Sequence, residues 1–379
     1  MKKLLFIVPS LETGGTLSSL ISIHDVLGSE YLFYIYPLVH EGIKNFTPSN
    51  KILKKNKLVH LYNCTYSKTK NIEKFEAFII KVLKRLSILF KFNLEYYIYK
   101  RAIKSIHAEK YDYVIGFQEG SATYFASLMH CKQKIAWIHC DYSKYPQCNK
   151  EFYTYDKFNK IICVSLYTAN VFSKIYPQLK KRTSYIYNLL NIDEIIHKSK
   201  EKINDLQLDN KIFTILSVGR ISTVKRFSLI PSVANTLAKH GINFRWIIIG
   251  PNYNDKCYKE LLDNIKLYNT ENNVFYLGNK NNPYPYFQNS DLLVSLSETE
   301  ACPMIFNEAK ILKLPIITTD FPTSYEFITE KNYGKIVPLE QISEAIINHI
   351  RHSTHSYQSN SSLEDYNAQI IKDIHNLFI

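Results

Sequence analysis

The sequence predicts an α/β protein built from two doubly wound, Rossmann-like domains. The chain has 379 residues, more than one hydrophobic core normally organises, so two domains are expected. Short apolar runs alternate with longer segments of helical periodicity along the whole chain. Because these runs lack strict apolar–polar alternation, they are typical of parallel strands buried on both faces of a sheet. Each domain should therefore have a parallel sheet covered by helices.

Candidate strands occur in both halves of the chain. In the first half they span residues 4–8, 31–36, 58–62, 112–117, 134–139, 160–165 and 183–188. In the second half they span residues 212–218, 244–250, 273–278, 291–296, 315–319 and 334–338. A polar, aromatic-free stretch at 191–211 separates the halves. We place the domains at 1–195 and 196–355, and we expect 356–379 to form a helix that crosses back to the first domain.

Charge and cysteine content narrow the class of protein. The net charge of +13 suggests an anionic partner, which could be nucleic acid, an acidic membrane surface or a phosphorylated small molecule. The seven cysteines are odd in number and form no Cys-x-x-Cys pair, which favours a reducing cytoplasm over a disulfide framework or zinc ribbon.

The apolar run 4–8 ends at Pro9 and is too short for a signal peptide. No run of about 18 uncharged apolar residues occurs, so no transmembrane helix is expected.

The segment 72–104 is unusually basic. It holds eight Lys or Arg residues against three Glu, a net charge of +5, with Phe and Tyr interleaved. One interpretation is a basic amphipathic surface that contacts anionic lipid headgroups at the inner face of a membrane. The other is one or two ordinary helices with a solvated basic face. The sequence leaves both interpretations open.

The loop after the run 212–218 is a candidate anion site. Gly219 permits a turn, and Arg220 and Lys225 follow at the carboxyl end of the expected strand. Ligands of open α/β sheets bind at that edge. A planar Arg fork and a Lys point charge together suit a diphosphate. A solvated basic loop is the alternative interpretation.

The stretch SETEACPMIFNEAKILKLPIITTD at 297–320 contains two glutamates in an apolar neighbourhood. Pro303 suits the first turn of a helix, so Glu300 should lie in the preceding loop and Glu308 inside the helix. The N–H groups around Met304 and Ile305 would face the carboxyl edge of the sheet and attract an anion. Glu308 could then accept hydrogen bonds from the two hydroxyls of a ribose diol. No Asp-x-Asp triplet occurs, so we expect no metal ion and no cofactor.

The first half has weaker signals. The loop ETGGT at 12–16 follows the first strand, and its Gly14 and Gly15 would let the backbone approach a ligand closely. It is not a Gly-x-Gly-x-x-Gly motif, so a dinucleotide site is poorly supported. His139 ends the run 134–139 and could contact a sugar hydroxyl, although a histidine bonded within its own loop is the commoner situation.

Taken in order, these residues resemble the family 4 glycosyltransferases of the GT-B fold, of the bacterial surface-glycan type. The strongest matching part is Glu300-x7-Glu308 with the upstream VGR…VK at 218–225. Further matching pieces are GGT (14–16), KIAWIH (134–139), ICVSLYTANVF (162–172), YNLLNID (187–193), IIIG (247–250), FYLG (275–278), TDFPTSYEFI (319–328) and YGKIVP (333–338). The resemblance covers nearly the whole chain.

The resemblance implies a metal-independent, retaining transfer of a hexose-type sugar from a nucleotide sugar to an acceptor hydroxyl. UDP sugars are favoured as donors and GDP sugars are possible; the acceptor would be a lipid-linked or surface-polysaccharide glycan. The domains would face each other across a cleft, with the acceptor bound by the first and the nucleotide sugar by the second. Glu300 and His139 would contact the donor sugar as catalytic residues. The donor-binding residues would be Gly14, Gly15, Thr16, Arg220, Lys225, Gly250, Met304, Ile305 and Glu308.

The chain departs from the family pattern close to its strongest motif. Ala301 stands where Gly usually follows the first glutamate, Cys302 replaces a commoner Phe or Leu, and Asn307 precedes Glu308 where an apolar residue is usual. These departures bear on which sugar fits. A nucleotide-sugar epimerase of the same fold and a non-catalytic glycan- or nucleic-acid-binding protein are the rival interpretations. Both glutamates and both cations favour the transferase, with no nucleic-acid partner.

Overall fold

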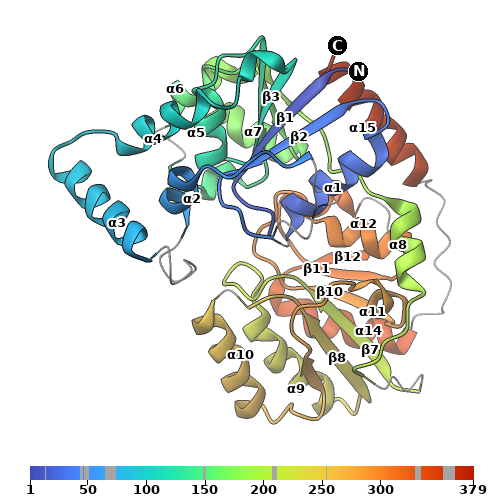
Figure 1. Cartoon of the computed structure of the whole chain (residues 1–379). Helices are drawn as coiled ribbons and strands as arrows, with labels where there is room; N and C mark the ends of the chain where they lie inside the picture. Colours follow the sequence, from blue (N-terminus) through green and yellow to red (C-terminus); the bar gives the residue numbers. More distant parts are fainter. Residues whose placement is uncertain are drawn as a thin grey trace. The chain divides into compact units, whose positions relative to one another are not determined.

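The computed structural model describes residues 1–12, 14–42, 46, 51–64, 74–147, 151–206, 211–252, 254–328, 334–352 and 363–379. The chain divides into two compact units (Figure 1). The first unit comprises Met1–Leu189 with Ile370–Ile379, and the second comprises Leu190–Gln369. The division precedes the predicted boundary at 195, because helix α8 (Ile192–Ser199) contacts α11 (Tyr284–Gln288) and α12 (Met304–Ile311) of the second unit.

The first unit is built on a six-stranded parallel sheet with the order β2-β1-β3-β4-β5-β6. Its strands are β1 (Lys3–Val8), β2 (Leu32–Pro37), β3 (Tyr113–Phe117), β4 (Gln133–Ile138), β5 (Lys160–Cys163) and β6 (Thr183–Tyr185). Its helices are α1 (Gly15–Leu27), α2 (Lys57–Asn63), α3 (Lys74–Leu89), α4 (Leu94–Ile103), α5 (Ser121–Ser127), α6 (Phe152–Tyr155) and α7 (Leu166–Ile175), with short 3-10 turns at Ala108–Lys110, Tyr142–Lys144 and Pro177–Arg182. Apart from one run, the candidate strands of this half are therefore confirmed.

The exception is the run 58–62, which forms helix α2 and not a strand. Asn56 begins this helix, because its side chain accepts a hydrogen bond from the Val59 N–H at 3.2 Å. The successive residues Val59, His60 and Leu61 are all buried. A short buried run gives no periodicity that separates a strand from a helix, so only the cap at Asn56 distinguishes the two.

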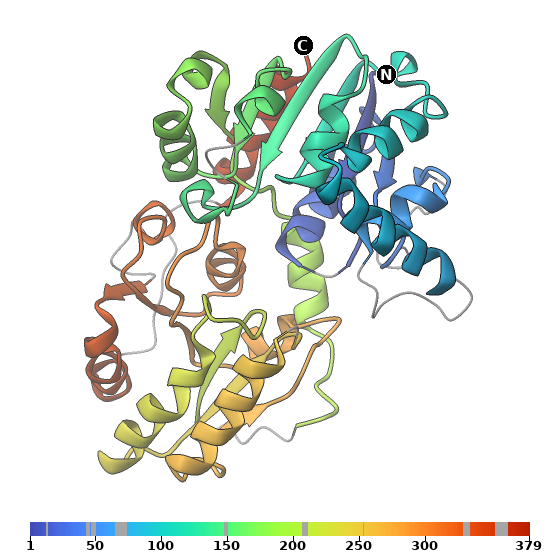
Figure 2. The same cartoon turned by 90° about the vertical axis from the view of Figure 1, so that its left-hand side faces the viewer.

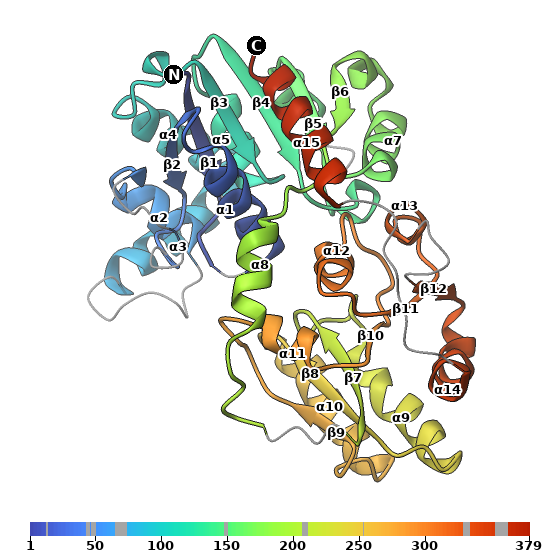
Figure 3. The same cartoon turned by 90° about the vertical axis from the view of Figure 1, so that its right-hand side faces the viewer.

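The second unit is built on another six-stranded parallel sheet, with the order β12-β11-β10-β7-β8-β9. Its strands are β7 (Phe213–Val218), β8 (Phe244–Ile249), β9 (Val274–Tyr276), β10 (Leu292–Ser295), β11 (Ile316–Thr319) and β12 (Gly334–Val337). Its other helices are α9 (Ile230–Lys239), α10 (Asp255–Leu267), α11 (Tyr284–Gln288), α12 (Met304–Ile311), α13 (Ser324–Phe327) and α14 (Ile342–His352), with 3-10 turns at Phe227–Leu229 and Leu339–Gln341. Helix α9 contacts α10 and α14, whereas α8 contacts α11 and α12 (Figure 3).

The last helix, α15 (Leu363–Leu377), ends in the first unit. Ile370, Ile374, Leu377 and Phe378 are buried there. The Phe378 ring lies 5.4 Å from the Tyr31 ring and 5.1 Å from the Tyr113 ring, between centroids. The Lys2 ammonium donates to the Ile379 carbonyl at 2.7 Å. The chain therefore returns to its first unit, as expected from the sequence.

Each sheet reverses its strand order at one position. In the second unit β7 lies between β8 and β10, and in the first unit β1 lies between β2 and β3. In the second unit the chain adds strands outward from β7 to β9 on one side and from β10 to β12 on the other. In the first unit it goes outward from β1 to β2 and from β3 to β6. The loops that follow the two strands at each reversal therefore leave toward opposite faces of the sheet. Such a switch point is where open α/β sheets bind ligands. The loops after β7 and β10 are therefore the place to look for a site in the second unit.

Two glycines let β7 and β8 end close together in the second unit. Gly219 and Gly250 directly follow the two strands and have φ angles of 153° and 152°. A Cβ atom on Gly250 would lie 1.8 Å from the Gly219 carbonyl oxygen. The Gly219 N–H donates to the Ile249 carbonyl at 2.9 Å, and the Gly250 N–H donates to the Gly278 carbonyl at 3.0 Å. Only a residue without a side chain fits at position 250.

We predict that Gly250→Ala destabilises the protein by about 4 kcal/mol, since the added methyl group must push the ends of β7 and β8 apart. Gly241→Ala is the matched control, because Gly241 also has a positive φ of 71° but a Cβ atom there meets nothing within 4 Å. Its cost should be about 1 kcal/mol, from backbone strain alone. Urea denaturation of both variants measures the two losses. Equal losses would contradict the close approach at Gly250.

Candidate active site

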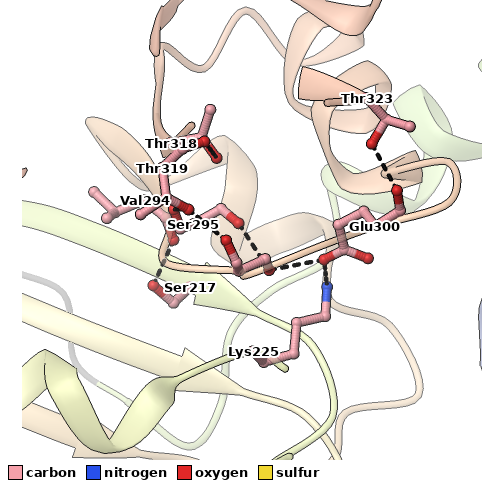
Figure 4. Close-up of polar contacts among 9 residues, drawn as sticks. Ser217, Lys225, Val294, Ser295, Glu300, Thr318, Thr319 and Thr323 are labelled. Carbon is pink, nitrogen blue, oxygen red and sulfur yellow. Dashed lines mark hydrogen bonds and ion pairs between the residues drawn. The ribbon is translucent and has the colours of Figure 1, made fainter. Parts of the chain in front are cut away.

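The loops after β7 and β10 meet at the switch point of the second sheet (Figure 4). The Lys225 ammonium, from the loop after β7, forms an ion pair with Glu300 Oε1, from the loop after β10. The Ser297 hydroxyl donates to the same carboxylate oxygen at 2.8 Å. The Thr323 hydroxyl, beyond β11, donates to the Glu300 backbone carbonyl at 2.6 Å. Glu300 is thus held by loops from three neighbouring strands.

Lys225 and Glu300 are both largely withdrawn from solvent, with side-chain exposures of 17% and 16%. The Lys225 side chain crosses Gly219, where a Cβ atom would lie 2.9 Å from Lys225 Cε. An ion pair at such low exposure interacts more strongly than one at an open surface, because less water screens it. The pair supplies a cation that already has a counter-charge, so an incoming anion would compete with Glu300 for Lys225.

Buried hydroxyl groups join the strand ends beneath this pair. The Ser217 hydroxyl donates to the Val294 carbonyl at 2.7 Å, and the Trp246 indole N–H donates to Ser217 Oγ at 3.0 Å. The Thr319 hydroxyl donates to the Ser297 carbonyl at 2.5 Å (Figure 4). Sequence reasoning did not select these residues. The sequence did hold a signal for polar contacts at this edge, because β7, β10 and β11 each have a Ser or Thr at or next to the last position.

Two further donors predicted from the sequence lie around the same edge. Arg220 follows Gly219 directly and is exposed, with no hydrogen bond or ion pair to any residue in the described ranges. Helix α12 begins at Met304 after Pro303, and the N–H groups of Met304 and Ile305 likewise have no partner in the described ranges. Pro303 is the residue before the helix, one position earlier than predicted. These free donors suit an anion at the start of α12.

Glu308 lies in the second turn of α12 and is half-buried. Burial raises the pKa of its carboxyl from the ordinary value of 4.5 to about 7, while the Tyr284 hydroxyl and the Lys225 charge act in the opposite direction. The Tyr284 hydroxyl donates to Glu308 Oε1 at 3.4 Å. Lys225 therefore acts on both glutamates of the motif. Tyr284, from α11, is a site residue that the sequence did not reveal, since nothing in its local pattern marks it.

The first unit holds the other predicted residues. Gly14 and Gly15 are exposed where α1 begins after β1, and a Cβ atom on either would meet nothing within 4 Å. Thr16 lies in the first turn of α1. His139 directly follows β4, and its ring lies edge-on to Phe117 with centroids 4.4 Å apart. Gly14, Gly15 and Thr16 thus follow β1 at the switch point of this sheet.

His139 is held by a residue that the sequence did not indicate. The Glu119 carboxylate accepts a hydrogen bond from the His139 backbone N–H at 2.9 Å. The imidazole Nε2 is buried and lacks a hydrogen-bond partner in the described part of the chain. Burial lowers the pKa of His139 from 6.5 to about 3, so the ring is neutral near pH 7. A neutral ring with an unsatisfied nitrogen can bind a ligand hydroxyl as donor or acceptor.

The predicted site residues thus form two groups. The second unit carries Arg220, Lys225, Gly250, Glu300, Met304, Ile305 and Glu308, and the first carries Gly14, Gly15, Thr16 and His139. That both groups bind one donor stays a prediction. Gly250 has a packing role of its own, at the close approach of β7 and β8. Within the described ranges no cluster of three or more His, Cys, Asp or Glu residues could hold a metal ion.

A known protein family is similar to the part of the chain that carries the candidate residues of the second unit. Residues 198–369 match the model of the family described as glycosyl transferases group 1. The matched residues span nearly the whole second unit, which therefore resembles a group 1 glycosyl transferase domain. Arg220, Lys225, Glu300 and Glu308 all lie within the matched residues.

Two curated relatives illustrate the match. An uncharacterized glycosyltransferase of Methanocaldococcus jannaschii is 28% identical over 177 residues, which are 46% of this chain and 42% of that protein. The N-acetylgalactosamine-N,N'-diacetylbacillosaminyl-diphospho-undecaprenol 4-alpha-N-acetylgalactosaminyltransferase of Campylobacter jejuni is 27% identical over 161 residues, 42% of this chain and 41% of that protein. The alignment therefore spans less than half the length of either relative.

A solved structure resembles the whole chain. Anabaena HepE in complex with UDP-glucose superposes with a TM-score of 0.70 at 14% sequence identity, over 99% of this chain and 100% of that one. At this identity the likeness is one of fold. Together with the two parallel sheets, it confirms the predicted two-domain α/β fold of the GT-B type.

The raised pKa of Glu308 predicts how stability depends on pH. Since the folded-state pKa of about 7 exceeds the ordinary 4.5, the native state binds the extra proton between these values, and stability falls as pH rises through that window. Glu308→Gln mimics the protonated form. We expect the free energy of unfolding of this variant, relative to that of the wild type, to be about 2–3 kcal/mol higher at pH 8 than at pH 5.

Urea denaturation at pH 5 and pH 8 measures this gain. The control is Glu260→Gln, on the exposed side of α10. If the stability of both variants changes with pH as much as that of the wild type, burial of the Glu308 carboxyl does not cause the pH dependence.

Proposed function

We propose that the protein is a glycosyltransferase that moves a sugar from a nucleotide-sugar donor to an acceptor hydroxyl. The observation that carries this proposal is the ion pair between Lys225 and Glu300 at the switch point of a unit that matches the group 1 glycosyl transferase model. The free donors of Arg220 and of the first turn of α12 lie on the same loops. A diphosphate needs several such donors, and a sugar needs a carboxylate beside them.

In this proposal the donor diphosphate binds Arg220, Lys225 and the N–H groups of Met304 and Ile305. Binding draws the Lys225 ammonium away from Glu300, which then accepts hydrogen bonds from hydroxyls of the donor sugar. Glu308, with Tyr284 beside it, binds the ribose diol. As the sugar–oxygen bond breaks, negative charge grows on the diphosphate and positive charge on the sugar ring. Cations and N–H groups already in position stabilise the first, and the Glu300 carboxylate stabilises the second.

We propose retention at the anomeric carbon, with the acceptor arriving on the face from which the diphosphate leaves. The bond from the anomeric carbon to the diphosphate oxygen breaks, the bond to the acceptor oxygen forms, and the acceptor proton passes to the departing diphosphate. His139 of the first unit would bind a donor-sugar hydroxyl through its neutral imidazole, with Glu119 as a positioning residue. The same donor would also be bound by Gly14, Gly15 and Thr16. No metal ion or cofactor is required in this scheme, because Arg220, Lys225 and the α12 N–H groups neutralise the leaving group.

The favoured donor is a UDP-linked hexose-type sugar, with a GDP sugar as the second choice. The UDP-glucose complex of the structurally similar HepE supports the first choice. The favoured acceptor is a lipid-linked glycan of a surface polysaccharide, at the cytoplasmic side of the membrane. The name of the C. jejuni relative, which acts on a diphospho-undecaprenol-linked sugar, supports this acceptor class.

We expect Arg220→Ala and Lys225→Ala each to lower kcat/KM for sugar transfer by about 10²- to 10³-fold, because each removes a donor to the charge that develops on the diphosphate. Arg351→Ala and Lys239→Ala, at exposed positions on α14 and α9, are the matched controls. Transfer is measured with UDP-glucose, UDP-N-acetylglucosamine and GDP-mannose on membranes that contain lipid-linked glycans. Full activity in both site variants would refute the proposed diphosphate site.

The same assay separates the rival activity and the metal question. Without acceptor, a transferase leaves the intact donor sugar unchanged, whereas an epimerase converts it to its isomer. Excess EDTA should leave the transfer rate unchanged. Isomerised donor without acceptor, or a rate restored only by added Mg²⁺ or Mn²⁺, would replace the scheme above.

A further inference from the structure

Helix α3 of the first unit presents a continuous apolar face to solvent. Phe75 is 73% exposed and Leu89 is 72% exposed, at opposite ends of this helix. At 100° per residue they lie on one side of α3 together with four further exposed apolar residues, Phe78, Ile79, Val82 and Leu86. The six side chains follow the spacing of a buried stripe, yet they are exposed. Isolated exposed apolar residues are ordinary, but a continuous stripe marks an interaction surface.

The opposite face of α3 already fixes the helix to its unit. Ala77 and Ile80 are buried in the core of the first unit, and Leu83 packs against it. The Lys84 ammonium donates to the Tyr62 carbonyl at 2.6 Å and lies 4.1 Å from the centroid of the Tyr62 ring. Helix α3 contacts α2 and α4 and lies at the edge of the unit (Figures 1 and 2). The exposed stripe is therefore additional to the face that folding uses.

The turn after α3 extends the apolar surface. Ile88 is 80% exposed and Phe90 is 70% exposed, and Phe92 follows at 38%. The turn is well defined, because the Phe90 N–H donates to the Leu86 carbonyl at 2.8 Å and the Phe92 N–H donates to the Ser87 carbonyl at 3.0 Å. The end of α3 thus presents large apolar side chains on an ordered turn.

Basic residues border this apolar surface. Lys74, Lys81 and Arg85 are exposed and share the side of α3 next to the stripe. Lys91 of the turn is exposed too, as are Arg101 and Lys104 around the end of α4. The one acidic residue within α3, Glu76, forms an ion pair with Lys57 at 2.7 Å. The surface therefore combines an apolar stripe with a positive border.

We propose that α3 and the turn after it bind the surface of an anionic lipid bilayer, with Phe75, Leu89 and Phe90 entering the interface. An apolar helix face bordered by Lys and Arg suits the boundary between acyl chains and anionic headgroups. A second copy of this chain would bring the same positive border against itself, and like charges repel. Among the described residues no helix is long and apolar enough to span a membrane, so this contact is interfacial.

This inference deepens the proposed function, since it supplies the surface on which a lipid-linked acceptor would be met. Its test does not depend on sugar transfer. Purified full-length protein is sedimented with vesicles of phosphatidylcholine alone and of phosphatidylcholine with 30% phosphatidylglycerol. We expect binding to the anionic vesicles only, and we expect 0.5 M NaCl to weaken it, because salt screens the headgroup charge.

Two variants separate the apolar and the charge contributions. Phe75→Ser with Leu89→Ser should weaken vesicle binding at least tenfold, by removing the side chains that enter the interface. Lys74→Gln, Arg85→Gln and Lys91→Gln together should weaken it about a hundredfold, at roughly fivefold for each basic residue. The matched controls, Tyr153→Ser with Leu267→Ser and Lys110→Gln with Lys132→Gln and Lys180→Gln, change exposed residues elsewhere and should bind as wild type.

Several outcomes would overturn the proposal. One is equal binding to both vesicle types, and another is wild-type binding by the α3 variants. A third is a wild-type dimer in sedimentation velocity that the Phe75→Ser, Leu89→Ser variant abolishes, which would make α3 an interface between copies. The Arg220→Ala variant should bind vesicles normally. If the protein transfers no sugar but still binds through α3, only the enzymatic proposal fails.

Discussion

The ion pair between Lys225 and Glu300 organises the second unit's candidate site. Glu300 takes contacts from the loops after β7, β10 and β11, and its partner Lys225 also acts on the pKa of Glu308. Both side chains are shielded from water, so removing either one would leave the other charge poorly solvated. One cation therefore acts on both glutamates of the motif, since Lys225 pairs with Glu300 and, against the larger effect of burial, lowers the pKa of Glu308.

This arrangement depends on a tight backbone beneath it. Gly219 and Gly250 let the ends of β7 and β8 approach, and the Lys225 side chain crosses Gly219 at the same place. Buried hydroxyls of Ser217 and Thr319 tie β7 and β11 to the main chain of β10 and its loop. This support holds the backbone of the loops in place, so that an arriving ligand charge has only to replace Glu300 as the partner of Lys225. Electrostatic stabilisation of a leaving diphosphate requires such a fixed framework.

The two units contribute different chemistry to the proposed reaction. The second unit offers cations, free N–H groups and a carboxyl of raised pKa, all suited to a nucleotide diphosphate. The first unit offers a neutral histidine held through Glu119, an exposed glycine turn, and the apolar face of α3 with its basic border. In this proposal one unit recognises charge on the donor, while the other is suited to sugar hydroxyls and to the lipid surface where an acceptor would lie.

The sequence by itself determined the two parallel sheets, nearly all of their strands and the returning C-terminal helix. It also selected Arg220, Lys225, Glu300 and Glu308 as candidate site residues. These features are local, because apolar runs, glycines and a proline before a helix act within a few residues. The tertiary structure decided that 58–62 is a helix, that Lys225 contacts Glu300, and that Tyr284 and Glu119 support the site. It also decided which face of α3 is free. Such features depend on which strands become neighbours and which helix face finds the core, and both are set by contacts between residues far apart in the chain.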